Sequence, residues 1–125
     1  SFFQFTQVSI LSRVTQAVCT NAGHLVESIL GYFLRGVPGL DVAWFPERGG
    51  EPEIDFVLTI GTQRIPIEVK YCRGKLNSDD LKGIESFCGK EHYSAPFGLV
   101  VTQQQEGEVG DCVIAIPAAS FLLVR

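Results

Sequence analysis

The sequence predicts a single α/β (α+β) domain, in which a mixed β-sheet is flanked by helices, and three observations indicate this fold class. The chain has 125 residues, the length of one compact domain. Residues 53–71 contain two segments of alternating polarity joined by a tight-turn dipeptide, which predicts a β-hairpin. Segments with apolar residues at helical spacing lie on both sides of this hairpin, so helices are expected to cover the sheet.

Two consecutive helices are expected before the sheet. Apolar residues recur every three to four positions over residues 8–18, which predicts a helix that ends before Asn21-Ala22-Gly23. A second amphipathic helix is expected over residues 23–36. In this prediction His24 is a polar residue at a helix start, and Glu27 is a charged residue inside a helix.

The predicted hairpin follows an expected edge strand at residues 41–46. Its two strands are residues 54–60 and 65–71, and the Gly61-Thr62 dipeptide between them suits a type II′ turn. Trp44 on the expected edge strand could stack on a nucleobase, although packing against a neighbouring domain is its expected role.

A helix and two buried strands are expected after the hairpin. Ser78 is a suitable N-cap for a helix that runs to about Glu91. The short apolar runs at residues 97–101 and 112–116 are typical of buried strands, and a polar loop is expected between them at residues 103–110.

Charge and cysteine usage restrict the class of partner and the compartment. The 10 Lys and Arg against 14 Asp and Glu give a net charge of -4, so the chain lacks the basic excess of proteins that bind nucleic acid by charge alone. A local basic strip is nevertheless present, at Arg64, Lys70, Arg73, Lys75, Lys82 and Lys90. The 4 cysteines contain no CxxC pair, which indicates reduced thiols and a cytoplasmic protein.

The apolar runs and the residue at position 1 bear on whether the domain associates with a membrane and whether it is cut from a longer chain. No apolar run approaches the roughly 18 residues of a membrane-spanning helix, so no membrane association is expected. The chain contains no methionine, not even at position 1, and we expect a single domain at residues 1–125 that is cut from a longer chain.

Two carboxylates and a lysine are expected to share one face of the hairpin. A turn centred on Gly61-Thr62 places Asp55 directly opposite Glu68, with Cβ atoms about 5 Å apart. Carboxylates so close repel each other unless a cation or a proton lies between them. Lys70, two residues after Glu68, projects from the same face. This group suits phosphodiester hydrolysis, in which a divalent metal activates water and a lysine stabilises the developing charge.

The same residues are also consistent with an ordinary strand surface. Glu68 and Lys70 would then be polar groups on a half-solvated face, and Glu53 opposite Lys70 would form a cross-strand ion pair. A turn register shifted by one residue would also place the two carboxylates on opposite faces. The pattern alone leaves both interpretations open.

A family resemblance favours the first interpretation. The segment Glu53-Ile54-Asp55-Phe56-Val57, a turn, and Ile65-Pro66-Ile67-Glu68-Val69-Lys70 together resemble the core motif of the PD-(D/E)XK nuclease superfamily. The helix that starts at Gly23, the segment 81–87 and the strand 98–101 extend the match to roughly residues 23–117. More narrowly, the chain is similar to the nuclease-like domain of unknown function that follows an ATPase module in many prokaryotic AAA-type proteins.

The resemblance implies a restriction-endonuclease-like fold and metal-dependent hydrolysis of DNA phosphodiester bonds. The implied ligands of Mg²⁺ or Mn²⁺ are Asp55, Glu68 and the backbone carbonyl of Val69. Lys70 would act on the attacking water and the transition state, and Glu27 would complete the acidic cluster from the first core helix.

The resemblance also implies two partners, namely DNA and an ATPase domain of the same or a partner chain. Arg73, Lys75 and Lys82 are the candidate DNA-contacting residues. A homodimer would let two sites cut two strands. The alternative function is a catalytically weak or inactive module of the same fold that binds DNA or a protein partner, which the acidic pI of about 5.1 favours.

Overall fold

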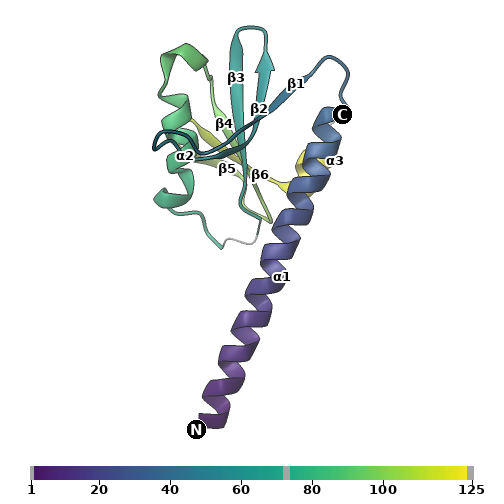
Figure 1. Ribbon diagram of the computed structural model, residues 1–125, viewed down its shortest axis with the longest axis vertical. Coiled ribbons are helices and arrows are strands. Elements are labelled where there is room, and N and C mark those ends of the chain that lie inside the picture. The colour runs from purple at the N-terminus through teal and green to yellow at the C-terminus, as the bar shows by residue number, and fades with distance from the viewer. Residues whose placement is uncertain (1, 72–73, 124–125) are drawn as a thin grey trace.

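The computed structural model describes residues 2–71 and 74–123, which form a six-stranded mixed sheet with helices on both faces (Figure 1). The strand order is β1-β2-β3-β4-β6-β5, in which β3–β4 and β4–β6 are parallel and the other neighbours antiparallel. This architecture confirms the predicted α/β (α+β) class. In chain order the elements are α1 (Phe2–Arg35), β1 (Asp41–Phe45), β2 (Ile54–Ile60), β3 (Gln63–Val69), α2 (Ser78–Cys88), the 3-10 helix η1 (Glu91–Tyr93), β4 (Gly98–Thr102), β5 (Gly107–Gly110), β6 (Val113–Pro117) and α3 (Ala118–Leu123).

The β2–β3 hairpin has the predicted register. Thr59 pairs with Arg64 and Ile60 with Gln63, so the turn is centred on Gly61-Thr62. Gly61 has a φ of 63°, and it is the only central residue of the turn with a positive φ. A type II′ turn requires this combination, which explains why glycine occupies the first central position.

One continuous helix, α1, replaces the two helices predicted before the sheet. The prediction of a break at Asn21-Ala22-Gly23 was wrong, because glycine inside a helix costs only about 1 kcal/mol relative to alanine and no proline follows to remove a hydrogen bond. Gly23 lies in the helix interior, with no atom near the place where a Cβ would stand. His24 therefore lies well inside the helix and not at a helix start.

The C-terminal part of α1 packs on one face of the sheet, and its N-terminal part extends beyond the sheet (Figure 1). Leu30 and Leu34 of α1 are buried in a core cluster with sheet residues and with Ala118 of α3. The opposite face is covered by α2, which contributes Leu81, Ile84 and Phe87 to a second cluster. Because both faces are covered, the middle of the sheet is apolar on both sides.

The start and end of α2 differ from the prediction. Its N-cap is Asn77 and not Ser78, because Asn77 and Asp80 form a capping box. The helix ends at Cys88, before the C-cap Gly89, and the residues after Lys90 form η1 instead of a last helical turn.

The C-terminal segment contains two elements that were not predicted. β5 lies in the segment 103–110, which was expected to be a polar loop. Its exposed edge position explains why it lacks an apolar alternation. The short helix α3 follows β6 directly and joins the core cluster of α1.

Gly98 allows α2 to lie close to β4. A Cβ at this position would collide with the side chain of Ile84 and would lie 3.3 Å from Cγ of Pro66. Ile84 is itself fully buried. The contact between α2 and the sheet therefore depends on the absence of a side chain at residue 98.

The predictions about membrane-spanning helices and about the cysteines can be compared with the structure. Across residues 2–71 and 74–123, no helix has both the length and the apolar character that crossing a bilayer requires. Cys19, Cys88 and Cys112 are free thiols, as expected from the spacing of the cysteines. The remaining cysteine, Cys72, lies outside the described residues.

Candidate active site

A cleft of about 490 Å³ lies between α1 and the end of the hairpin opposite its turn. The five residues that the resemblance assigns to catalysis or metal binding all line this cleft: Glu27, Asp55, Glu68, Val69 and Lys70. Four of them come from the hairpin strands or the position after β3, and one comes from the helix that faces the strand ends. The structure thus brings together residues separated by more than a quarter of the sequence.

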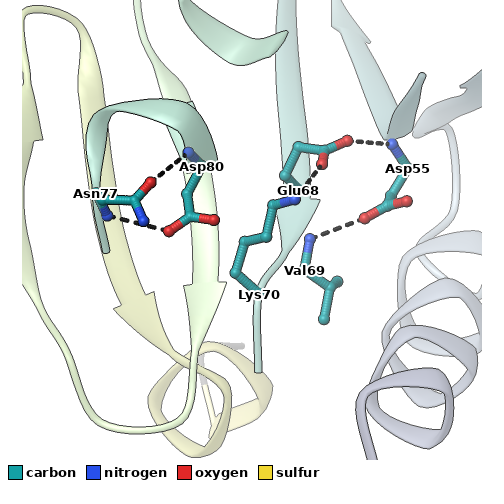
Figure 2. A network of polar contacts seen from close by, with 6 residues as sticks. All are labelled: Asp55, Glu68, Val69, Lys70, Asn77 and Asp80. Atoms are coloured by element: carbon teal, nitrogen blue, oxygen red, sulfur yellow. Dashed lines mark hydrogen bonds and ion pairs between the residues drawn. The ribbon is translucent and has the colours of Figure 1, made fainter. Parts of the chain in front are cut away.

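Asp55 and Glu68 are held by a reciprocal pair of hydrogen bonds to the backbone (Figure 2). The N–H of Val69 donates to Oδ2 of Asp55 at 2.8 Å, and the N–H of Asp55 donates to Oε1 of Glu68 at 3.0 Å. These bonds use one oxygen of each carboxylate. Each acidic side chain is therefore fixed by the neighbouring strand, with its second oxygen outside this pair of bonds.

Lys70 places a positive charge beside Glu68. Its Nζ lies 3.7 Å from Oε2 of Glu68, and the two side chains are 24% and 13% exposed. Its N–H donates to the carbonyl of Val101 at 2.9 Å, which ties Lys70 to β4 just after β3 ends. The ion pair of Lys70 is thus made with Glu68 on its own strand.

Burial raises the pKa of both hairpin carboxylates. The pKa of Glu68 is raised to about 7, mainly by desolvation and further by repulsion from Asp55, whereas the hydrogen bond from the backbone of Asp55 and the charge of Lys70 oppose the shift. Desolvation also raises the pKa of Asp55, against the hydrogen bond from the Val69 N–H. A cation in the cleft would favour the charged forms of both groups.

One face of α1 forms the opposite wall of the cleft. The pKa of Glu27 on this face is raised by burial and then by the charges of Asp55 and Glu53, which places Glu27 in the same electrostatic field as the hairpin carboxylates. The other α1 residues of the wall were not among the predicted site residues: Gln16, Cys19, Thr20, Gly23 and His24. Their spacing of three to four residues is a detectable signal for one helix face, but the predicted helix break hid it.

The donor set of the cleft fits a hard divalent cation. Among the residues that the structure describes, no three His, Cys, Asp or Glu side chains are grouped so as to hold a metal by themselves. Mg²⁺ commonly uses one or two carboxylates and retains several waters, which Asp55 and Glu68 can provide for. The N–H of Val69 points toward Asp55, and the carbonyl of the same strand residue points to the same side, so it is a suitable third oxygen.

The predicted DNA-contacting lysines do not line this cleft. Lys75 lines a separate pocket with Thr102 and the glutamines that follow it. Lys82 lies on the surface of α2, where its Nζ pairs with Oδ1 of Asp79 at 2.9 Å. Arg73 lies outside the described residues. A contact of these residues with DNA stays a prediction.

Comparison with known proteins identifies a family for this chain. The family model described as a domain of unknown function, DUF4143, matches residues 22–121. A search of the curated proteins and a search of the solved structures each found no match to this chain. The matched range contains Glu27, Asp55, Glu68 and Lys70, together with the whole sheet. Because the match spans most of the 125 residues, the chain belongs to the DUF4143 family.

Proposed function

We propose that this chain is a nuclease domain of the PD-(D/E)XK type, which hydrolyses phosphodiester bonds of DNA with Mg²⁺ or Mn²⁺. The observation that carries the proposal is the meeting of Asp55, Glu68 and Lys70 on one wall of the cleft, with Glu27 on the facing helix. The narrower resemblance, to a domain that follows an ATPase module, supports a role accessory to such a module.

The energetics of the two hairpin carboxylates support this proposal. Asp55 and Glu68 lie side by side in a partly buried position, and desolvation and mutual repulsion both raise the pKa of Glu68. Such an arrangement weakens the fold when both groups are charged and no cation is bound. Perturbed carboxylates in a cleft are more common at functional sites than on ordinary strand surfaces.

Each residue has a distinct role in the proposed reaction. Asp55, Glu68 and the carbonyl of Val69 would hold the metal, which would supply a polarised water and neutralise phosphate charge. The ammonium of Lys70, fixed beside Glu68, orients the attacking water and stabilises the negative charge that develops on the phosphate oxygens. Glu27 completes the acidic cluster from the facing helix.

A second candidate function is a nuclease-fold module that binds DNA or a protein partner without cleavage. The ion pair between Lys70 and Glu68 favours this alternative, because an ammonium 3.7 Å from Oε2 of Glu68 offsets part of the carboxylate repulsion without a metal. The two candidates differ in whether the chain breaks a phosphodiester bond when a divalent metal is present.

A cleavage assay decides between the two candidates. Plasmid, linear and branched DNA are incubated with the chain in Mg²⁺ or Mn²⁺, alongside Glu68→Ala, Lys70→Ala and the matched control Glu108→Ala on the exposed edge strand β5. Metal-dependent cleavage by the parent and the control, lost in both cleft variants, would support the nuclease. A folded parent that cleaves none of these substrates with either metal would support the binding module.

A further inference from the structure

Three neighbouring hollows that share lining residues form a track from the candidate active site to an aromatic pocket. Glu27 and Asp55 line the cleft and also line a neighbouring hollow of about 480 Å³, whose wall includes Arg35 and Trp44. Trp44 in turn lines a third hollow of about 280 Å³. Because adjacent hollows share lining residues, Trp44 stands on a surface path that begins at the carboxylates.

Trp44 lies opposite an irregularity in the pairing of the edge strand β1 with β2. Ala43 pairs with Val57 and Phe45 pairs with Ile54, so two residues of β2, Asp55 and Phe56, lie opposite Trp44, and the extra residue belongs to β2. Bulges of this kind redirect a side chain and are frequent beside active sites. The bulge therefore places Trp44 opposite Asp55 of the candidate site, and the two residues line the same hollow.

The indole of Trp44 is exposed, whereas the next aromatic residue belongs to the fold. Trp44 is 57% exposed. The ring of Phe45 makes edge contacts with Phe87 at 5.6 Å and with Tyr93 at 5.8 Å between centroids. Phe45 is thus used in packing, and the larger part of the Trp44 side chain is available to a ligand.

Positive side chains lie on both sides of Trp44 along the track. Arg35 lines the hollow between Trp44 and the cleft, together with three carboxylates that also line the cleft. Arg48 and Lys90 line the aromatic pocket on the other side, where Lys90 pairs with Glu51. An exposed aromatic ring flanked by cations is the combination that single-stranded nucleic acid requires, because the ring stacks on a base and the cations meet the phosphates.

We propose that Trp44 is a stacking platform for an unpaired base of single-stranded DNA, whose backbone follows the track to the cleft. The class of this ligand rests on the proposed nuclease function. A paired base cannot present its face to the indole unless it leaves the duplex stack, which costs a few kcal/mol. Unpaired nucleotides are therefore the preferred ligand, and a neighbouring protein domain at Trp44 becomes an outcome of the test.

The test uses tryptophan fluorescence, which reports on Trp44 alone because the chain contains 1 tryptophan. Short oligothymidylate is titrated into the chain in the presence of EDTA, so that binding is measured without metal-dependent cleavage. We expect saturable quenching of Trp44 by the single strand and much weaker quenching by a duplex of the same length. With a labelled strand, Trp44→Ala is expected to raise the Kd on the order of 10- to 100-fold.

Two further variants separate stacking from general surface effects. Trp44→Phe keeps an aromatic face and is expected to retain most of the affinity. Tyr32→Ala is the matched control, because Tyr32 is 86% exposed and lines none of the three hollows. Affinity is expected to be unchanged in this control.

The proposal would be overturned by no quenching by the single strand, by an unchanged Kd for Trp44→Ala, or by equal quenching by duplex. A fluorescence change that follows protein concentration and not DNA would also overturn it, and would assign Trp44 to a protein contact. Binding in EDTA and cleavage with metal are measured independently, so either proposal can be refuted while the other holds. Quenching without cleavage would refute the nuclease and retain the stacking site, and cleavage without quenching would do the reverse.

Discussion

Asn77 and Asp80 at the start of α2, and Asp55 and Glu68 at the strand ends, make the same kind of contact with opposite consequences (Figure 2). Asn77 Oδ1 accepts from the N–H of Asp80 at 3.1 Å, and Asp80 Oδ2 accepts from the N–H of Asn77 at 3.0 Å. This exposed pair caps the start of the helix. The hairpin pair has similar distances but is partly buried and contains two carboxylates.

The comparison teaches that reciprocal hydrogen bonding does not by itself indicate a functional site. The capping box contains one charged group near a helix N-terminus, where negative charge is favourable. In the hairpin pair, burial raises the pKa of both acids, and a neighbouring carboxylate adds to each shift: Glu53 to that of Asp55, and Asp55 to that of Glu68. The signal of function is the unfavourable charge arrangement, and the following predictions test whether it separates the two pairs.

The largest expected effect is the loss of cleavage in Asp55→Asn. The amide oxygen can still accept from the N–H of Val69, so the variant removes charge and keeps the hydrogen bond. We expect metal-dependent cleavage to fall on the order of 100- to 1,000-fold, measured as initial rate on plasmid DNA. Cleavage at the parental rate would mean that the hairpin pair is as structural as the capping box.

The second effect is an unusual pH dependence of stability in the metal-free chain. Glu68 has a pKa of about 7 when folded and an ordinary value of 4.5. Because the folded pKa is the higher one, this group's stabilisation is fully present below about pH 4.5 and is lost as the pH rises through about 7. The shift corresponds to a contribution on the order of 3 kcal/mol to the free energy of unfolding.

Urea titrations at several pH values across this window measure the effect. Glu68→Gln removes the titrating group, so its free energy of unfolding is expected to vary less with pH than that of the parent. Identical pH profiles for the two proteins would show that Glu68 does not carry the predicted proton linkage.

The third effect is stabilisation by metal. A cation that binds only the folded chain raises the free energy of unfolding by about 2.7 kcal/mol when its concentration is 100 times its Kd. We expect Mg²⁺ to raise the Tm of the parent and to leave that of Asp55→Asn unchanged. A rise of equal size in both proteins would place the bound metal elsewhere.

The smallest effect is the loss of the helix cap in Asn77→Ala. The variant removes the oxygen that accepts from the N–H of Asp80, and it is expected to lower the free energy of unfolding by about 1 kcal/mol. Because the cap lies outside the cleft, the rate of cleavage and the response to Mg²⁺ should match those of the parent. A selective loss of cleavage in this variant would contradict the separation of the two pairs.

The hairpin could be predicted from the sequence because its register depends on local information. The alternation of the two strands and the positive φ available to Gly61 select one pairing, and this pairing brings Asp55 to Glu68. Its residues lie within a short segment, so no distant contact is needed to position them.

The rest of the site depends on contacts between distant parts of the chain. Asn77 as the N-cap and Gly23 inside α1 show that a local pattern fits more than one boundary, and packing decides between them. His24 enters the cleft only because α1 is continuous and lies against the strand ends. Trp44 lies opposite Asp55 because of an extra residue in β2, which no periodicity in the sequence reveals.

The close approach of α2 to β4 determines which substitutions the chain accepts at Gly98, and Gly61 is restricted for a different reason. At Gly98 the constraint is volume, because even a methyl group would collide with Ile84. At Gly61 the constraint is conformation, because φ is 63° but no atom lies near the missing Cβ. In a saturation scan, Gly61 should therefore accept asparagine, which visits this conformation readily, whereas Gly98 should accept no other residue, alanine included.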